Sequence, residues 1–289
     1  MSSFQPPWDD FRETVRRAVA EDMPNGDPTG ALVGARPAAA RLVAREAGTL
    51  AGLVAAQIVL DQVSERLGTG PAKARPGVED GGRVDAGQVL GELSGPADTL
   101  LAAERSILNL LTHLSGVATA TAAFVSAVAG TGTVVRDTRK TLPGLRAVEK
   151  YAVRCGGGSN HRLGLSDAIL VKDNHVAAFG GVSGAVEAAL RASGPALPVE
   201  VEVDSLSELD EALAAGAHLV LVDNMSLEDT REAVRRARDS GAKVEASGGI
   251  TLANARAVAE CGVDFIAAGA LTHSARALDI GLDWEGLGP

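Results

Sequence analysis

The strongest constraint on the fold is a regular alternation of short apolar runs and amphipathic segments in the second half of the chain. Repeated βα units predict a parallel sheet, because a parallel connection has to cross back over the face of the sheet and usually does so as a helix. About six units in succession favour a barrel over an open doubly wound sheet, but they are too few for a standard eight-stranded barrel. We therefore expect an incomplete parallel α/β barrel. The runs are 133–137, 168–173, 199–204, 218–224, 243–249 and 264–270.

The first 110 or so residues have a different pattern and are expected to form a separate α/β layer. Segments with apolar residues at helical spacing alternate there with short strand-like segments that are bounded by turn residues. The long apolar stretch that follows has a potential helix break at Ser115-Gly116. The pattern predicts helices over 8–21, 53–67 and 98–130, a strand over 38–46, and a small antiparallel hairpin within 77–95.

Composition limits the classes of protein to which the chain can belong. With 46% hydrophobic and 22% charged residues it has enough apolar material for one large or two modest cores. Its 27 Lys and Arg against 37 Asp and Glu give a net charge of -10, which argues against binding nucleic acid or anionic membrane by bulk charge. Any anionic ligand must therefore be bound by a local basic site.

The compartment is expected to be the reducing cytoplasm. The only cysteines, Cys155 and Cys261, lie far apart and suggest neither a disulfide framework nor a zinc site. Residues 1–11 lack the apolar core of a signal peptide, and polar residues interrupt the most apolar stretch, 100–129. We expect neither export nor membrane insertion.

Polar residues end most of the apolar runs. In βα barrels the carboxyl ends of the strands form the rim at which active sites are built. Capping of the following helix explains any one of these residues equally well, but it is the weaker explanation for five strands in succession. The residues are Asp137, Lys172, Glu202 with Asp204, Asp223, and Ser247.

Basic residues are concentrated in one part of the predicted barrel. Residues 136–172 contain eight Lys and Arg and three acids, a charge of +5, so the rest of the chain carries -15. A basic cleft in an acidic protein attracts small anions. The residues at predicted strand ends or turns can bind carboxylate or phosphate groups, whereas Arg146, Lys150 and Arg154 are better explained as a solvated helix face. The first group is Arg139, Lys140, Arg162 and Lys172.

Two further features point to a phosphorylated substrate. Glu202 and Asp223 end neighbouring predicted strands, and such a carboxylate pair can hold a hydrated Mg²⁺, directly or through water. The turns Ser247-Gly248-Gly249 and Ala268-Gly269-Ala270 follow the last two strands, where barrels often bind phosphate through backbone N–H groups. No Cys-His or Ser-His-Asp arrangement is recognisable from spacing.

At this point the residues resemble a known family. The 39 residues "DTRKTLPGLRAVEKYAVRCGGGSNHRLGLSDAILVKDNH" (137–175) closely resemble the signature of the quinolinate phosphoribosyltransferases, also called carboxylating nicotinate-nucleotide pyrophosphorylases. Collinear motifs extend the resemblance over nearly the whole chain, and no matched position departs from the family pattern. They include "EDMPNGDPTG" (21–30), "AERSILNLLTHLSGVAT" (103–119), "LVDN" (221–224), "EASGGI" (245–250) and "GALTHSARALDIGLD" (269–283).

The resemblance implies both a fold and a reaction. The fold is an N-terminal α/β sandwich over residues 1–115, joined by the C-terminal segment 275–289, plus an incomplete α/β barrel over 116–274. The reaction transfers the 5-phosphoribosyl group of phosphoribosyl pyrophosphate to the ring nitrogen of quinolinate. It releases the 2-carboxylate as CO₂, gives nicotinate mononucleotide and pyrophosphate with Mg²⁺, and belongs to NAD biosynthesis.

The resemblance also implies roles for individual residues. Arg139, His161, Arg162 and Lys172 would surround the two quinolinate carboxylates, and Lys140 would lie close to substrate and pyrophosphate. Arg105 would complete the pocket from the neighbouring subunit of a homodimer, or of a hexamer built from such dimers. Glu202 and Asp223 would face the ribose and the metal. The 5-phosphate would be held by Ser247, Gly248, Gly249 and Gly269, with help from His273.

Three other functions stay open at this stage. One is a related phosphoribosyltransferase or pyrophosphorylase with a different acceptor, against which the full set of carboxylate-binding residues argues. Another is a barrel lyase that uses Lys172 as a Schiff base. A third is a catalytically silent ligand-binding protein, for which the acids Glu202 and Asp223 would have little use.

Overall fold

The computed structural model describes residues 5–194 and 197–285. Contacts between Cα atoms divide the chain into two compact units. Unit 1 comprises residues 1–122, 141–157 and 274–289, and unit 2 comprises residues 123–140 and 158–273. The segment 141–157 thus belongs to unit 1, although the sequence assigned it to the barrel. Residues 1–4 and 286–289 of the expected N-terminal domain lie outside the described residues.

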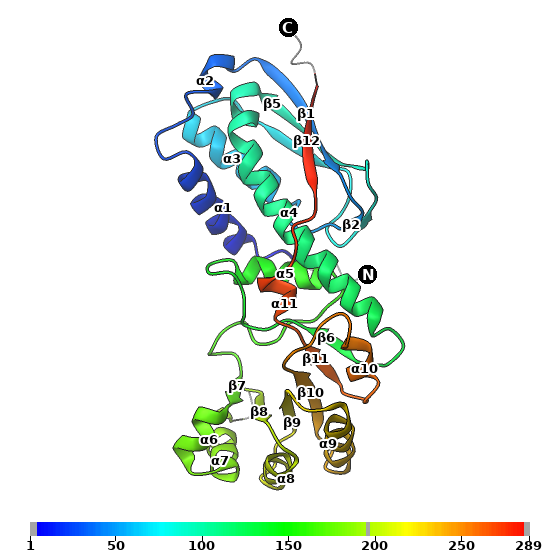
Figure 1. Cartoon of the computed structure of the whole chain (residues 1–289). Helices are drawn as coiled ribbons and strands as arrows, with labels where there is room; N and C mark the ends of the chain where they lie inside the picture. The colour runs from blue at the N-terminus through cyan, green and yellow to red at the C-terminus, as the bar shows by residue number, and fades with distance from the viewer. Residues whose placement is uncertain (1–4, 195–196, 286–289) are drawn as a thin grey trace. The chain divides into compact units, whose positions relative to one another are not determined.

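Unit 1 is built on a four-stranded antiparallel sheet with the order β12-β1-β5-β3. Figure 1 shows β12 beside β1, although the two strands lie near opposite ends of the chain. The elements of unit 1 are α1 (Trp8–Asp22), α2 (Gly30–Val33), β1 (Pro37–Ala44), β2 (Gly48–Thr49), α3 (Ala55–Leu67), β3 (Lys73–Pro76), β4 (Arg83–Val84), β5 (Val89–Pro96), most of α4 (Ala97–Ala127), α5 (Arg146–Cys155) and β12 (Ile280–Glu285).

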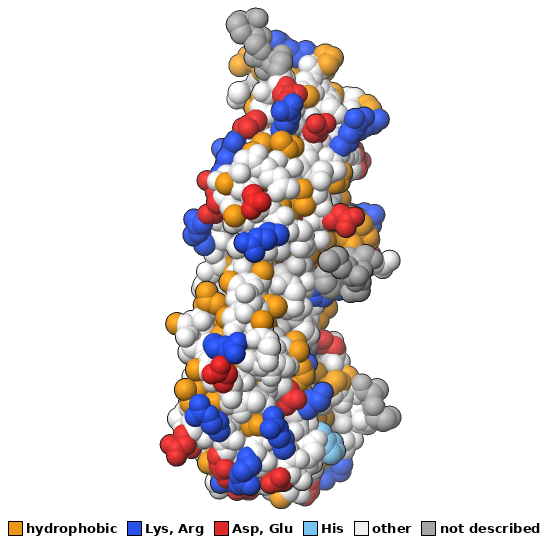
Figure 2. Space-filling model, turned by 90° about the vertical axis from the view of Figure 1, so that its right-hand side faces the viewer, with side chains coloured by type: hydrophobic (Ala, Val, Ile, Leu, Met, Phe, Trp, Pro, Cys, Tyr) orange, Lys and Arg blue, Asp and Glu red, His pale blue; other side chains and the backbone are white. Residues whose placement is uncertain are grey.

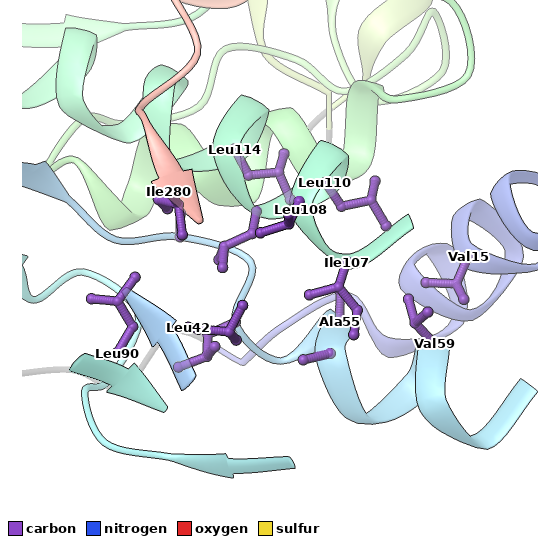
Figure 3. Close-up of a cluster of buried hydrophobic side chains, with 14 of the residues drawn as sticks. Val15, Leu42, Ala55, Val59, Leu90, Ile107, Leu108, Leu110, Leu114 and Ile280 are labelled. Atoms are coloured by element: carbon purple, nitrogen blue, oxygen red, sulfur yellow. The ribbon is translucent and has the colours of Figure 1, made fainter. Parts of the chain in front are cut away.

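The core of unit 1 lies between this sheet and its helices. In α1 the residues Phe11, Val15 and Val19 are buried at intervals of four, as expected for one face of a helix. Figure 3 shows side chains from α1, α3, α4, β1, β5 and β12 converging in one cluster. Contacts between helices and sheet therefore stabilise unit 1, rather than contacts between two sheets.

The helix break expected at Ser115-Gly116 is absent: α4 is continuous over its 31 residues. A Cβ atom on Gly116 would lie 2.3 Å from the carbonyl oxygen of Arg276, so this glycine permits close packing of the C-terminal segment instead of ending the helix. By length and composition α4 could cross a membrane, but half of its most apolar window is buried within the protein. A core helix of a globular protein can meet the same criteria of length and composition. The buried face of α4 packs in the core of unit 1.

The hairpin expected within 77–95 is also wrong. The two strands of that region pair with other strands: β4 with β2, and β5 with both β1 and β3. The turn at 85–88 has the expected turn residues, with the N–H of Gln88 bonded to the carbonyl of Asp85. Local turn chemistry was therefore recognised, but the long-range partners of the strands depend on packing that the local pattern does not contain.

Unit 2 is an incomplete parallel α/β barrel, as predicted. Its six parallel strands have the order β6-β11-β10-β9-β8-β7, and among the described residues the ladder ends at β6 and β7. Unit 2 contains β6 (Val134–Arg136), β7 (Ile169–Val171), α6 (Asp173–Phe179), α7 (Val182–Ser193), β8 (Val199–Val203), α8 (Leu206–Ala214), β9 (Leu219–Asp223), α9 (Leu227–Asp239), β10 (Lys243–Ser247), α10 (Ala255–Ala259), β11 (Phe265–Ala267) and α11 (Ala270–His273).

Side chains alternate along the strands of unit 2 between an apolar face that is covered by helices and a polar face inside the barrel. In β8, Val201 and Val203 belong to the hydrophobic cluster that includes residues of α7, α8 and α9. Successive side chains of a strand point to opposite faces, so Glu200 and Glu202 share the other face. The barrel interior is therefore polar where the helix-covered face is apolar.

Charged side chains of both signs are mixed on one face of the molecule (Figure 2). On the face shown in Figure 2, Lys and Arg side chains are interspersed with Asp and Glu side chains. Several form ion pairs within one helix, such as Arg16 with Glu13 at 2.7 Å and Arg235 with Glu232 at 2.6 Å. Exposed pairs of this kind contribute little to stability.

Candidate active site

A cavity of about 360 Å³ lies at the carboxyl ends of the strands of unit 2. Cavities of this size hold small ligands. Its walls come from β7 to β11 and from the loops that follow β6, so residues far apart in the sequence converge there. The lining residues are Thr138, Arg139, Lys140, His161, Arg162, Leu170, Lys172, Glu202, Leu221, Asp223, Glu245, Ser247 and Ala267.

Four Lys and Arg side chains line this cavity: Arg139, Lys140, Arg162 and Lys172. Burial lowers the pKa of Arg162, and the positive charge of Arg139 lowers it further. One guanidinium nitrogen of Arg162 donates to the carbonyl of Ala168 at 3.1 Å, while its buried Nε has no acceptor among the described residues. Close cations that repel each other favour an anionic ligand with more than one negative group.

Acidic groups lie beside the cations. The Nζ of Lys172 is 2.5 Å from Oε2 of Glu202, and Asp223 accepts a hydrogen bond from the Asn224 amide at 2.9 Å. Burial raises the pKa of the nearby Asp204, and the negative charges of Glu208 and Asp223 raise it further. The acids of this rim therefore repel one another, and a cation bound there would relieve the repulsion.

The donor set at this rim fits a hydrated divalent cation. Mg²⁺ prefers oxygen ligands, keeps several waters, and is usually held by one or two carboxylates together with substrate phosphates. Glu202 and Asp223 both line the cavity and both have carboxylate oxygens.

The floor of the cavity contains a buried polar cluster that sequence reasoning missed. Nε2 of His161 lies 2.7 Å from Glu200 and 3.6 Å from Glu245, and Glu245 accepts from Arg136 at 2.7 Å. Burial raises the pKa of Glu245 to about 7, with the negative charge of Glu200 as the second cause. The guanidinium of Arg136 also stacks on the ring of Phe265, 3.7 Å from its centroid.

The ligand atoms of His161, Glu200 and Glu245 lie within 4.8 Å of one another, a spacing that a metal ion could use. Arg136 already provides a cation for Glu245, and His161 already bonds Glu200. We therefore describe this group as a hydrogen-bonded ion-pair network rather than as a metal centre.

The turn after β10 brings backbone close to the end of β9. Gly248 has φ +80°, and a Cβ atom there would lie 2.4 Å from Oδ1 of Asn224. Asn224 itself has φ +54°, and its N–H donates to the carbonyl of Ser247 at 3.1 Å. The turn that carries Ser247 and Gly249 is thus tied to the acid-bearing end of β9, and only glycine fits at 248 without displacement.

The turn after β11 makes a second close contact. A Cβ atom on Gly269 would lie 3.0 Å from Cδ of Lys140 and 3.1 Å from Nε2 of His273. The hydroxyl of Thr272 donates to the carbonyl of Lys140 at 2.8 Å. The small residue at 269 therefore lets the basic side chains of Lys140 and His273 approach the same turn.

Most of the residues singled out from the sequence converge. Eight of them line the cavity, while Gly248, Gly249, Gly269 and His273 belong to the two adjacent turns. Arg105 is an exposed residue of α4 in unit 1 and is not one of the cavity residues. The eight are Arg139, Lys140, His161, Arg162, Lys172, Glu202, Asp223 and Ser247.

Two of the missed residues had a recognisable signal. Glu200 lies two residues before Glu202, and Glu245 lies two residues before Ser247. Because side chains two apart on a strand share a face, a charged residue at either position has to point into the barrel interior with the rim residue. A search restricted to strand ends therefore misses both residues.

Comparisons with known proteins place the whole chain in one family. Residues 27–115 match the family model described as "Quinolinate phosphoribosyl transferase, N-terminal domain", and residues 117–283 match the corresponding C-terminal domain. A "Nicotinate-nucleotide pyrophosphorylase [carboxylating]" of Mycobacterium leprae is 51% identical over 96% of this chain and 98% of its own. The human protein of that name is 42% identical over 91% of this chain and 88% of its own.

Solved structures agree as well. The nicotinate-nucleotide pyrophosphorylase of Francisella tularensis superposes with a TM-score of 0.88 at 39% identity, covering 97% of this chain and 98% of that one. The sandwich domain and the incomplete barrel therefore occur together in a relative of nearly the same length. The chain belongs to the quinolinate phosphoribosyltransferase family.

Proposed function

We propose that this protein transfers the 5-phosphoribosyl group of phosphoribosyl pyrophosphate to the ring nitrogen of quinolinate and releases the 2-carboxylate as CO₂. The products are nicotinate mononucleotide and pyrophosphate, and the reaction belongs to NAD biosynthesis. The observation that carries the proposal is the convergence of Arg139, Arg162 and Lys172 in one cavity with Glu202 and Asp223. Quinolinate has two carboxylates, and this cavity offers cations for both beside acids suited to a sugar that becomes positively charged.

The first step requires stabilisation of separating charges. As the bond between C1 of the ribose and the pyrophosphate oxygen breaks, its electron pair leaves with pyrophosphate and positive charge develops on the sugar. Carboxylates held in place beside the sugar stabilise that charge most effectively when water is excluded. Glu202 and Asp223 have this role in the proposal, and Lys140 neutralises the leaving group.

The second step needs correct placement of the ring more than a protein nucleophile. Once the ring nitrogen has bonded to C1, the electron pair of the broken bond between C2 and the carboxylate remains on C2, next to the positively charged nitrogen. A proton from solvent then completes the product ring. Arg139, Arg162 and Lys172 hold the carboxylates so that the nitrogen faces the sugar.

Glu202 and Asp223 are also the residues proposed to hold Mg²⁺, directly or through water. When bound, the ion would neutralise pyrophosphate charge. The 5-phosphate is assigned to the backbone of Ser247, Gly248 and Gly249 and to the turn at Gly269, with His273 beside it. Backbone N–H groups in turns with positive φ form such anion sites.

The assembly is proposed to be a homodimer in the cytoplasm, or a hexamer built from such dimers, with active sites shared between subunits. Arg105, exposed on α4, would be donated to the cavity of the neighbouring subunit. An Arg105→Ala protein mixed with an Arg162→Ala protein tests this directly. Recovery of activity on mixing would support shared sites, and its absence under conditions of subunit exchange would contradict them.

The reaction itself is tested with quinolinate labelled in the 2-carboxylate, in the presence of Mg²⁺ and phosphoribosyl pyrophosphate. Equal yields of labelled CO₂ and nicotinate mononucleotide, with no product from nicotinate as acceptor, are expected. A folded oligomer that binds phosphoribosyl pyrophosphate but gives neither product from quinolinate would contradict the proposal and favour a transferase with a different acceptor.

A further inference from the structure

The buried cluster under the cavity is arranged around the ring of His161. Its Nε2 lies 2.7 Å from Oε2 of Glu200, a side chain that is almost wholly buried. Its Nδ1 accepts a hydrogen bond from the backbone N–H of Arg162 at 2.7 Å. Both ring nitrogens therefore already have protein partners.

These contacts define the tautomer of the ring. A nitrogen that accepts from an N–H cannot carry a hydrogen itself, so the proton of the neutral imidazole is on Nε2 and is donated to Glu200. A doubly protonated ring would direct the hydrogen on Nδ1 against the N–H of Arg162. In this arrangement His161 has no N–H to offer a carboxylate in the cavity.

The same segment is fixed from its other side. The backbone N–H of His161 donates to Oδ1 of Asp137 at 2.9 Å, and Asp137 is completely buried. The N–H of His161 therefore bonds to the buried Asp137, and the next N–H along the backbone, that of Arg162, bonds to the ring of His161. The next residue is Arg162, whose guanidinium faces the cavity.

Burying the carboxylate of Glu200 costs free energy, and a specific role would explain why a carboxylate occupies this position. A carboxylate removed from water loses its hydration and regains it only through hydrogen bonds, and Oε1 of Glu200 has no partner among the described residues. An apolar side chain of similar size would fill the same position at lower cost. What it could not do is accept the Nε2 hydrogen and hold the ring in this orientation.

We propose that Glu200 is a positioning residue: it orients the ring of His161, which fixes the backbone of Arg162 so that its guanidinium binds a carboxylate of the acceptor substrate. His161 is then also a positioning residue rather than a substrate ligand. This inference rests on the proposed function, because it takes the anion at Arg162 to be a carboxylate of quinolinate.

The test compares Glu200→Gln with Glu200→Met by steady-state kinetics. Glutamine keeps an acceptor oxygen for a neutral imidazole, so its KM for quinolinate should stay within about threefold of the wild type. Methionine removes the acceptor, and loss of one such hydrogen bond should raise that KM about tenfold. In both variants kcat and the KM for phosphoribosyl pyrophosphate should change much less.

Two outcomes would overturn the positioning role. If His161 were a charged ligand held by the charge of Glu200, glutamine would weaken quinolinate binding as much as methionine does. If Glu200 were only structural, neither variant would change the KM for quinolinate, although thermal stability would fall. Should Glu200→Met not fold, the glutamine variant alone still distinguishes a required charge from a required acceptor.

A control separates these outcomes from a failure of the proposed function. Asp80→Asn alters a half-buried, hydrogen-bonded carboxylate in unit 1 and should lower stability without changing the KM for quinolinate. A wild-type protein that gives no product with quinolinate would defeat the proposed function. Normal wild-type turnover with an unchanged KM in Glu200→Met would defeat the positioning role alone.

Discussion

Each unit of the molecule contains a histidine bonded to a buried glutamate, and the two pairs differ in how the glutamate is satisfied. In unit 1, Nε2 of His113 lies 2.8 Å from Oε1 of Glu149, and the second oxygen of Glu149 accepts the N–H of Leu142 at 3.2 Å. In unit 2, His161 bonds one oxygen of Glu200 at 2.7 Å, while the other oxygen has no partner among the described residues. Both glutamates are buried.

The difference separates polar groups that hold the fold together from polar groups that shape a site. Asp80 in unit 1 accepts from the N–H groups of Gly52 and Leu53 and from the hydroxyl of Tyr151, so the cost of its burial is offset locally. Glu200 and Glu245 lie at or beneath a cavity with their bonding capacity partly unused. Incomplete satisfaction of buried polar groups is typical of a site rather than of a core.

The largest effect is expected from Asp223→Asn in unit 2. The substitution keeps size and removes the negative charge that the developing sugar cation requires, so kcat should fall about 1000-fold with little change in thermal stability. Steady-state kinetics and a thermal melt measure both. Asp229→Asn, at an exposed helix start on α9, is the matched control and should retain wild-type kcat. A decrease in kcat of less than tenfold for Asp223→Asn would contradict the assignment of Asp223 to the sugar site.

The second effect concerns the cationic part of the same cavity. Arg162→Ala and Arg139→Ala should each raise the KM for quinolinate about 100-fold, because each removes a charge-assisted hydrogen bond to a carboxylate. The KM for phosphoribosyl pyrophosphate should change much less. Isothermal titration with quinolinate provides an independent reading. An unchanged KM in both variants would defeat the assignment of these arginines.

The third effect belongs to unit 1. Asp80→Ala leaves two backbone N–H groups and a tyrosine hydroxyl without their acceptor, so the free energy of unfolding should fall by about 2 kcal/mol. Chemical denaturation measures that loss, and kinetics at a temperature where the variant is folded should give a wild-type KM for quinolinate. A changed KM for quinolinate with unchanged stability would mean that Asp80 shapes the active site and does not stabilise the fold.

The sequence was most informative where structure is local or repetitive. The barrel followed from the repeated βα pattern, and the cavity residues Lys172, Glu202, Asp223 and Ser247 followed from the rule that rim residues end strands. The partners of β4 and β5 did not follow, because strand pairing depends on distant packing. Gly116 was taken for a helix break because its close contact with Arg276 involves residues 160 positions apart.

The assignment of His161 shows a different limit. Its place in the signature identified it as a cavity residue, which agrees with its position in the structure. Its orientation depends on Glu200, 39 residues away on another strand, and on the N–H of its own neighbour. A pattern of residue types identifies members of a site, but hydrogen-bond geometry is needed to say which of them can reach the ligand.

The last effect is a pH dependence of stability that unit 2 should show through Glu245. Its pKa in the folded protein is raised from the ordinary 4.5 to about 7, first by burial and then by the charge of Glu200. Between these values the folded protein retains a proton that the unfolded chain has lost, so stability should fall as pH rises from about 4.5 to 7, by at most about 1.4 kcal/mol per pH unit. Glu245→Gln removes this titration. Denaturation at pH 5 and pH 8 should therefore show a smaller loss of stability in the variant than in the wild type, and equal losses would mean that Arg136 and His161 keep Glu245 charged throughout.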